Sequence, residues 1–429
     1  MPGITVGVVK DQELIWSKGY GSVDVKKNLP ASPSTIFSIC SISKLFTSVA
    51  IMQLYEKGKL RLDDSVSMHL PKYNLKQQYK LTGPVTIRGL LTHSSGLPRE
   101  SDYPYWTGPE YPFPTQQQIS DRLGSQQTLY PPATYFQYSN LGMTLLGEIV
   151  EKISGKPYDV YVEENILKPL RLAETHPYLP AAQWGSKMAI GYGAIKRDRT
   201  RDQIGLFDAK GIKAAAGFSS NVEDLARFAS WQLRLLNTGK TEILKASTLK
   251  EMHRVQWMDP DWKGSWGLGF SVSQVDGKTL VGHGGSCPGY RTTLSIDPKE
   301  KMAFVVMINA GGESPERYAT QIRKILEKVA KEKVSKVDSL NLQQYTGRYN
   351  SQPWGSETQV VPWYGKLAVI GFPANSPSDA ITQLKHVQGD VFRRVRSDDT
   401  LGEEVVFQKD KSGKIVGYTQ HSNNYARLK

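Results

Sequence analysis

One short stretch, Ser41-Ile42-Ser43-Lys44, constrains the chain most, because it precedes a predicted helix that runs toward Gly58. Ser41 is expected in the first turn, and Lys44, three residues later, projects from the same face one turn on. A serine beside a lysine is a nucleophile beside a base, and a helix N-terminus stabilises negative charge on the serine oxygen. Taken alone, so short a motif is more often a capping serine and a solvated lysine.

The composition is that of a folded protein. With 429 residues, the chain has room for about two or three domains. Hydrophobic residues make up 39% and aromatic residues 10%, which is enough for a sizeable core. The net charge of +13 is scattered, apart from the loop at residues 196–201. No basic-aromatic module typical of nucleic-acid binding is present, so we attribute the charge to solubility and a mild attraction to anionic surfaces.

Features missing from the sequence narrow the class of protein. No apolar run approaches the length of a membrane span, and the N-terminus lacks the basic start and apolar segment of a signal peptide. Two cysteines make neither a disulfide framework nor a metal cluster. We therefore expect no membrane span, no nucleic-acid partner, no metal and no cofactor, with the cytoplasm as the default compartment.

Strand and helix signals alternate along the first three quarters of the chain. Residues 4–16 predict an opening β-hairpin, and residues 60 to about 205 are rich in helix signals and Pro/Gly loops. Strands return between residues 266 and 308, followed by a helix to about Val334. This part of the chain is therefore expected to combine a sheet with helices.

The last part of the chain has a different character. The charged, core-poor stretch at residues 331–337 is the best linker candidate. From about residue 338 the pattern consists of short alternating strands, with a hairpin signal at residues 411–413. These signals predict a small antiparallel barrel or sandwich. The expected domains are residues 1–332, with the helical part at about 60–205, and residues 338–429.

Two further features each have two interpretations. His93 closes a short predicted helix, where a histidine is more often a structural hydrogen-bonding group than a catalytic one. An aromatic, proline-broken loop follows at residues 103–114. Such a loop either walls an apolar substrate cleft or packs on its own domain. The sequence favours neither interpretation of the loop.

Three motifs in order carry a resemblance to a known superfamily: Ser41-Ile42-Ser43-Lys44, Tyr138-Ser139-Asn140 and His283-Gly284-Gly285. Their order, together with flanking landmarks such as residues 90–98 and 266–270, resembles the beta-lactamase-related serine hydrolases. That superfamily includes class C beta-lactamases, DD-peptidases, D-aminopeptidases and beta-lactamase-like carboxylesterases. The resemblance covers roughly residues 1–330.

The resemblance implies an α+β fold, with an antiparallel sheet flanked by helices, a mostly helical subdomain and then a small all-β barrel domain. The last part, with Tyr345-Thr346-Gly347-Arg348-Tyr349 near its start, resembles the lipocalin-like domain of some relatives. Relatives usually carry a helix before the first strand, whereas this chain starts almost at that strand. A truncated start would also hide a signal peptide.

The resemblance also implies roles for individual residues. Ser41 would attack an acyl carbonyl, and Lys44 and Tyr138 would share the role of base. Asn140 would donate a hydrogen bond to the substrate or hold Lys44. The remaining substrate-binding candidates lie on one motif: His283, Gly284, Gly285 and Ser286. The backbone amides of Ser41 and Ser286 would stabilise the oxyanion, and the two glycines would leave room for the substrate.

These roles support three readings of the function. The leading one is a serine hydrolase that forms an acyl-enzyme on small esters or amides, most simply a carboxylesterase. The second is a D-amino-acid-specific peptidase or amidase, or a DD-peptidase-like penicillin-binding protein with weak beta-lactamase activity. The third is a non-catalytic binding or filament-forming homologue. The expected partner is a small ester, amide or peptide, and self-association is left open.

One substitution within the motifs bears on the substrate. Class C beta-lactamases carry a lysine where this chain has His283. A permanent cation there suits a carboxylate-bearing substrate, whereas a histidine with a pKa near 6.5 is mostly neutral at pH 7. Efficient beta-lactam hydrolysis is therefore less expected, although some DD-peptidases and D-aminopeptidases also use histidine here.

The two cysteines flank the proposed oxyanion-binding amides. Cys40 precedes Ser41, and Cys287 follows Ser286. If both serine amides bind one oxyanion, the cysteines are neighbours. Our hypothesis is that they form a disulfide or a redox-sensitive pair, and the alternative is two ordinary buried thiols.

Overall fold

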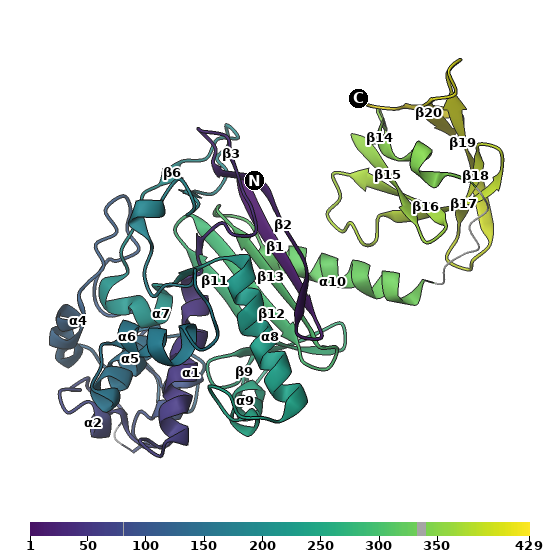
Figure 1. The fold of residues 1–429 in the computed structure, drawn as a ribbon. Helices are drawn as coiled ribbons and strands as arrows, with labels where there is room; N and C mark the ends of the chain where they lie inside the picture. The colour runs from purple at the N-terminus through teal and green to yellow at the C-terminus, as the bar shows by residue number, and fades with distance from the viewer. Residues whose placement is uncertain (80, 333–339) are drawn as a thin grey trace. The chain divides into compact units, whose positions relative to one another are not determined.

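Apolar strands of the first 319 residues form one antiparallel sheet in the computed structural model, which describes residues 1–79, 81–332 and 340–429 (Figure 1). The strand order is β3-β2-β1-β13-β12-β11-β10-β9-β8. The bounds are β1 (Gly3–Lys10), β2 (Glu13–Asp24), β3 (Leu29–Pro30), β8 (Trp257–Met258), β9 (Ser265–Trp266), β10 (Ser271–Val275), β11 (Lys278–Cys287), β12 (Tyr290–Asp297) and β13 (Met302–Ile308). The predicted opening hairpin is β1 and β2, paired antiparallel.

The middle strands of this sheet are buried on both faces. Nearly every residue of β1 and β13 is buried, which explains their continuous apolar runs. Helix α8 (Val222–Thr238) packs against both strands. It begins where Asn221 accepts a hydrogen bond from the Asp224 amide and ends at Gly239, whose φ of 69° suits glycine.

The helical part is built around α1 (Ser43–Glu56), in which every residue from Ser43 to Leu54 is buried. It contacts α5 (Asn140–Ser154), α6 (Tyr158–Val162) and α7 (Lys213–Ala216). Ser139 caps α5 by accepting the Gly142 amide, and Gly155 ends it. The other helices of eight or fewer residues are α2 (Val66–His69), α3 (Ile87–Leu91), α4 (Gln116–Arg122) and α9 (Ala246–His253). A helix buried on all sides is the rigid centre from which the Ser41 region extends.

Short strand pairs tie the loops of this part together. Their bounds are β4 (Phe37–Ser38) with β7 (Ser219–Ser220), and β5 (Gly191–Tyr192) with β6 (Gln203–Ile204). The aromatic loop packs on its own domain, since Tyr105 and Phe113 are buried and Phe113 stacks on Phe207. Of the two interpretations of this loop, the structure supports packing on its own domain for Tyr105 and Phe113.

The chain divides into two compact units, Met1–Ala319 and Thr320–Lys429. Helix α10 (Pro315–Lys331) contains the boundary between them. The predicted linker at residues 331–337 lies outside the described residues from position 333 onward.

The second unit contains a nearly closed antiparallel barrel, as the sequence predicted. Its eight strands neighbour one another in chain order, and the pairing of Tyr349 with Arg427 brings the first strand to the last. Five buried aromatic residues dominate its core: Tyr345, Tyr349, Phe392, Phe407 and Tyr418. The strands are β14 (Gly347–Asn350), β15 (Glu357–Trp363), β16 (Lys366–Phe372), β17 (Ile381–Gln388), β18 (Val391–Val395), β19 (Leu401–Lys409), β20 (Ile415–Gln420) and β21 (Asn423–Ala426).

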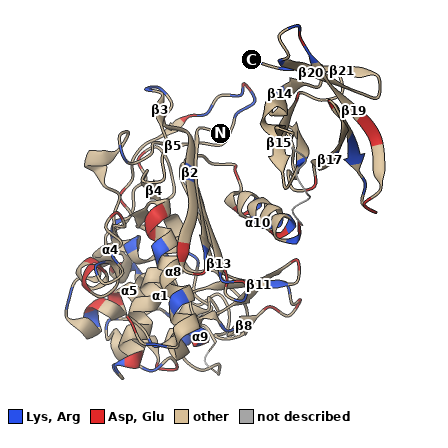
Figure 2. Ribbon diagram, turned by 45° about the vertical axis from the view of Figure 1, so that its right-hand side comes forward, with Lys and Arg blue, Asp and Glu red and all other residues tan. Residues whose placement is uncertain are grey.

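Charged residues of both signs are spread over both units (Figure 2). This distribution agrees with the scattered charge of the sequence. Over the described part of the chain, every helix is too short or too polar to serve as a membrane span. The same residues contain no group of three or more His, Cys, Asp or Glu side chains that could hold a metal ion.

Candidate active site

Ser41 lies in a tight turn at the start of the buried helix. The turn is a 3-10 segment, Cys40–Ile42, and α1 follows directly, so Ser41 precedes the α-helix rather than occupying its first turn. Ser43 fixes this turn, since its hydroxyl donates to the Cys40 carbonyl at 2.5 Å and accepts the Phe218 amide at 3.0 Å. The Ser43 hydroxyl therefore ties the turn that carries Ser41 to the backbone at Phe218.

Lys44 is fully buried and points at Ser41. Its Nζ lies 3.2 Å from Ser41 Oγ, 2.7 Å from Asn140 Oδ1 and 2.8 Å from the Ala215 carbonyl. Burial lowers the pKa of Lys44 well below its usual value, and among the weaker effects Glu100 raises it and Arg99 lowers it. A neutral amine has two hydrogens, which the Asn140 and Ala215 oxygens accept. In that neutral form the lone pair would be left for the contact with Ser41, which is the arrangement that a general base needs.

Tyr138 lies beside both Ser41 and Lys44. Its ring centroid is 4.8 Å from Lys44 Nζ and 5.0 Å from Arg99 Cζ. Burial raises the pKa of Tyr138, while a hydrogen bond with Ser41 and the charge of Arg99 oppose the rise. The Tyr138 side chain is therefore a neutral phenol, which can donate and accept a proton, rather than a permanently ionised phenolate.

Asn140 holds Lys44 through one end of its amide. The other end donates from Nδ2 to Glu100 Oε1 at 2.6 Å, and Trp106 donates to the same oxygen at 3.0 Å. Glu100 thus determines that the carbonyl of Asn140 faces Lys44. Sequence reasoning missed Glu100, because its partner lies 40 residues away and no periodicity links the two.

His283 enters the site from β11 as a neutral ring. Burial lowers its pKa to about 3, and nearby Lys44 adds to the effect. Its Nδ1 donates to the Gly284 carbonyl at 2.6 Å, which leaves Nε2 as an acceptor without a partner among the described residues. The ring centroid lies 6.2 Å from that of Tyr138.

The two glycines after His283 differ in their surroundings. A Cβ on Gly285 would lie 2.3 Å from the Ile39 carbonyl, so glycine is required there for the sheet to approach the Ser41 turn. A Cβ on Gly284 would meet the tip of the Glu316 side chain at 3.0 Å. Gly285 therefore has a packing role that the sequence did not reveal, and Ser286 is exposed next to it.

The end of β11 has a free edge. Strand β10 pairs with β11 only as far as Gly282, whereas β12 pairs with it through Cys287. From His283 to Cys287 the β10 side is therefore unpaired in the described residues. Backbone groups on such an edge can pair with an extended ligand.

Cys40 and Cys287 form a disulfide, as one branch of the hypothesis predicted. Their Cα atoms are 5.7 Å apart, and Ser38 Oγ lies 3.4 Å from the Cys287 sulfur. The bond joins the turn that carries Ser41 to the strand that carries Ser286. It ties together the two backbone amides that the sequence assigns to the oxyanion.

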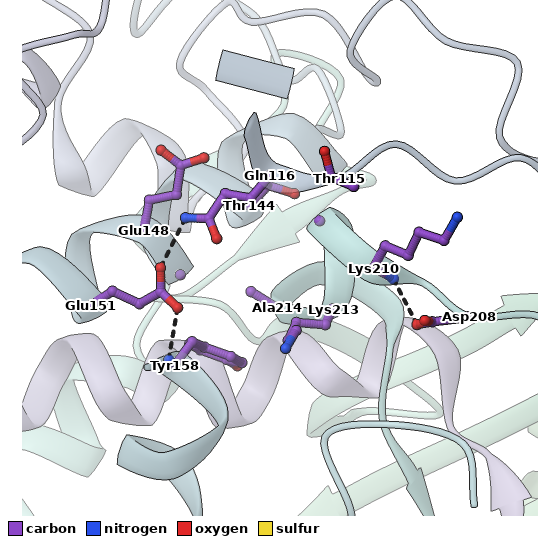
Figure 3. Close-up of a pocket in the computed structure, with 12 residues that line it drawn as sticks. Thr115, Gln116, Thr144, Glu148, Glu151, Tyr158, Asp208, Lys210, Lys213 and Ala214 are labelled. Carbon is purple, nitrogen blue, oxygen red and sulfur yellow. Dashed lines mark hydrogen bonds between the residues drawn. The ribbon is translucent and has the colours of Figure 1, made fainter. Parts of the chain in front are cut away.

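A separate cavity of about 270 Å³ is lined by residues that include Thr144, Glu148, Glu151, Tyr158 and Lys213 (Figure 3). Burial, and the charge of Glu151, raise the pKa of Glu148 to about 7. Glu151 accepts the Tyr158 amide at 2.8 Å and Gln116 Nε2 at 2.9 Å. None of the residues predicted for the site lines this cavity.

A comparison with known protein families identifies the same family that the fold and the order of the three motifs indicate. A family model described as beta-lactamase matches residues 1–327. The chain belongs to the beta-lactamase family. Its resemblance to the beta-lactamase-related serine hydrolases is thereby confirmed.

Individual relatives are distant. Protein flp of Staphylococcus aureus is 26% identical over 361 residues, which cover 82% of this chain and 67% of that protein. A structure described as the octameric penicillin-binding protein homologue from Pyrococcus abyssi has a TM-score of 0.67 at 25% identity, covering 99% of this chain and 96% of that one. EstCE1, described as a hydrolase with promiscuous acyltransferase activity, matches 75% of this chain and 92% of its own at 23% identity and a TM-score of 0.62, which shows the shared fold.

Proposed function

We propose that this chain is a serine hydrolase that cleaves small esters through an acyl-enzyme on Ser41. The observation that carries the proposal is the surroundings of Lys44. A buried amine whose two other contacts are the Asn140 and Ala215 oxygens, with Ser41 Oγ at 3.2 Å, has the arrangement of a base beside a nucleophile.

The reaction follows from this arrangement. Ser41 Oγ attacks the acyl carbonyl while Lys44, together with Tyr138, accepts its proton. The tetrahedral oxyanion is stabilised by the backbone amides of Ser41 and Ser286. The proton then moves to the leaving alcohol, and a water molecule hydrolyses the acyl-enzyme by the same route in reverse. Which of Lys44 and Tyr138 is the primary base does not alter the outcome.

The neutral state of His283 favours uncharged substrates. A ring whose pKa is lowered to about 3 supplies no cation at neutral pH, so it offers nothing to pair with a substrate carboxylate. Its free Nε2 accepts a hydrogen bond instead. An ester without a carboxylate meets the charge requirement, and a hydroxyl or amide N–H elsewhere in the substrate would supply the donor for Nε2.

A second candidate is a peptidase or amidase for D-amino-acid substrates. The free edge of β11 favours it, because an extended peptide backbone can add to residues 283–287 as an extra strand. We further propose residues 1–332 as the hydrolase domain and the segment from residue 338 as a domain that restricts or orients substrates. The octameric state named for the Pyrococcus abyssi homologue supports self-association.

A parallel substrate panel tests the proposal. Short- and medium-chain nitrophenyl esters, D- and L-amino-acid anilides and a chromogenic cephalosporin are compared between the wild type and Ser41→Ala. Ester turnover that falls by about 10³-fold or more in the variant supports the ester reading. Preferential cleavage of D-anilides selects the second candidate. Ester turnover that survives Ser41→Ala contradicts both.

A further inference from the structure

One residue outside the three motifs, His93, contacts the backbone on both sides of Tyr138. The Gln137 amide donates to the His93 carbonyl at 2.7 Å, and the Ser139 amide donates to His93 Nδ1 at 3.1 Å. The imidazole also lies along the phenol, with ring centroids 4.3 Å apart and planes inclined by 31°. Tyr138 is thus fixed at its preceding residue, at its following residue and along its ring.

His93 is itself held in one place. It is fully buried, and its φ of 56° lies in the left-handed region, which non-glycine residues rarely occupy. The rings of Phe136 and Trp266 meet the imidazole edge-on at 5.9 and 5.1 Å. A residue kept in an unfavourable backbone conformation by its surroundings is typical of a functional site.

The proton of the imidazole has a defined position. An amide N–H only donates, so Nδ1 of His93 must carry the lone pair, and the ring hydrogen is on Nε2. Burial lowers the pKa of His93 well below its usual value, and nearby Lys44 adds to the effect. The ring remains a neutral acceptor at neutral pH and adds no positive charge beside Lys44.

The same contact extends to the next motif residues. The Ser139 amide donates a hydrogen bond to His93. The Ser139 hydroxyl caps α5 and also donates to the Pro98 carbonyl at 2.7 Å. Asn140 follows as the first residue of α5 and accepts a hydrogen bond from Lys44. A shift at His93 would therefore move Tyr138 and the start of α5 together.

We propose that His93 is a positioning residue for the acylation step, which sets the place of the Tyr138 hydroxyl relative to Ser41 without touching the substrate. The inference rests on the proposed function, because it assigns Tyr138 a role in that reaction. It builds on the sequence-based interpretation of His93 as a structural hydrogen-bonding group, and it adds which catalytic candidate those hydrogen bonds position. Displacement by about 1 Å of a proton-transfer group lowers a rate by about 10²-fold.

Two substitutions separate positioning from folding. Glycine and asparagine both tolerate the left-handed backbone at position 93. His93→Gly removes the acceptor and the ring, whereas His93→Asn keeps an acceptor oxygen near the place of Nδ1. A matched control is His253→Asn, which changes another buried neutral histidine whose Nε2 bonds Gln232 at 2.9 Å rather than a residue of the candidate site.

The kinetics of a nitrophenyl ester give the first test. We expect His93→Gly to lower kcat by about 10²-fold with KM within about threefold, and His93→Asn to recover about tenfold of that loss. His253→Asn should keep the wild-type kcat. A wild-type kcat in His93→Gly, or an equal loss in His93→Asn, would overturn the positioning role. A wild type without Ser41-dependent turnover would overturn the proposed function and this role with it.

Nitrogen NMR of the wild-type protein with labelled histidine gives a second test that needs no folded glycine variant. The resonances of His93 are assigned by their absence in His93→Asn. The contact with Ser139 predicts an unprotonated Nδ1 and a protonated Nε2 at neutral pH. A ring protonated on Nδ1, or on both nitrogens, would show that His93 does not accept the Ser139 amide and would overturn the inference.

Discussion

Helices α5 and α7 border two polar regions with opposite properties. At the Ser41 site, Lys44 of α1 donates to the Asn140 side chain of α5 and to the Ala215 carbonyl of α7. At the cavity of Figure 3, α5 contributes Glu148 and Glu151. Thr47, one turn after Lys44, forms hydrogen bonds with the Tyr158 hydroxyl and the Ala214 carbonyl, and both of these residues line the cavity.

Lys44 and Glu148 differ in their hydrogen-bond partners as well as in their burial, since Lys44 is fully buried and Glu148 is half-buried. Burial shifts the pKa of both Lys44 and Glu148 toward the neutral form. Lys44 has three oxygen neighbours, and one of them is Oγ of Ser41, the proposed nucleophile. Glu148 Oε1 has no hydrogen-bond partner among the described residues, and Glu151 repels its charge. Desolvation thus favours the neutral amine of the proposed base at the Ser41 site, and it makes the ionised form of Glu148 unfavourable at the cavity.

The largest expected effect on activity comes from removing the Lys44 amine at the Ser41 site. Lys44→Met should lower kcat for a nitrophenyl ester by about 10³-fold, because general-base catalysis is lost. The matched control is Lys213→Met. Lys213 lines the cavity, and its amine pairs with Asp159 at 3.2 Å. The control should keep its activity, measured alongside the melting temperature. Equal losses of kcat in the two variants would mean that the Ser41 site and the cavity lined by Glu148 do not differ in function.

Breaking the disulfide should come next in size. Reduction of Cys40–Cys287 by a dithiol gives two thiols and the oxidised reagent, and it frees the Ser41 turn from β11. We expect kcat to fall by about 10²-fold through the oxyanion-binding amides, and the free energy of unfolding to fall by about 2–5 kcal/mol.

Activity is measured before and after reduction, with mass spectrometry of alkylated thiols to confirm the chemistry. The double variant Cys40→Ala/Cys287→Ala is the control, since it should not respond to the dithiol. An unchanged kcat with both thiols alkylated would mean that packing alone holds the amides in place.

A smaller effect concerns the two charges beside the site. Glu100 raises the pKa of Lys44 and Arg99 lowers it. Because the neutral amine is the active form, Glu100→Gln should move the acidic limb of the kcat/KM profile to lower pH, and Arg99→Gln should move it to higher pH. The plateau should change by less than about tenfold, since neither group transfers a proton. Shifts in the same direction would contradict the assignment of the limb to Lys44.

The smallest expected effect is on stability alone. The pKa of Glu148 is raised to about 7 in the folded protein, against 4.5 for the free side chain. The folded state therefore binds a proton that the unfolded state has released between these values, so stability falls as pH rises through this window. Glu148→Gln should raise the free energy of unfolding by about 3 kcal/mol at pH 8 and leave it unchanged at pH 4.

Urea unfolding at the two pH values measures this difference. The kcat of Glu148→Gln should equal that of the wild type, because the cavity contains none of the proposed site residues. A stabilisation of equal size at pH 4 and pH 8 would show that proton release from Glu148 is not its source.

Local geometry made much of the molecule predictable. The three-residue spacing of Ser41 and Lys44 fixes their common face, whatever surrounds them. The alternation of residues 358–361 and 405–407 likewise identified barrel strands, now seen within β15 and β19. Strands β14, β17 and β21 were not predicted, because their half-exposed patterns lack a clear alternation.

The sequence by itself determined the family motifs and the order of the candidate site residues, and their resemblance to the beta-lactamase-related serine hydrolases implied the α+β fold. Strand periods indicated the C-terminal barrel, because such periods depend on neighbours in the chain. Only the tertiary structure decided that Glu100 orients Asn140, that His93 fixes Tyr138 and that Gly285 makes room for Ile39. These contacts join residues 40 or more positions apart, and no local pattern records them. They depend on how α1, α5 and β11 pack, which is settled by burial of the whole core.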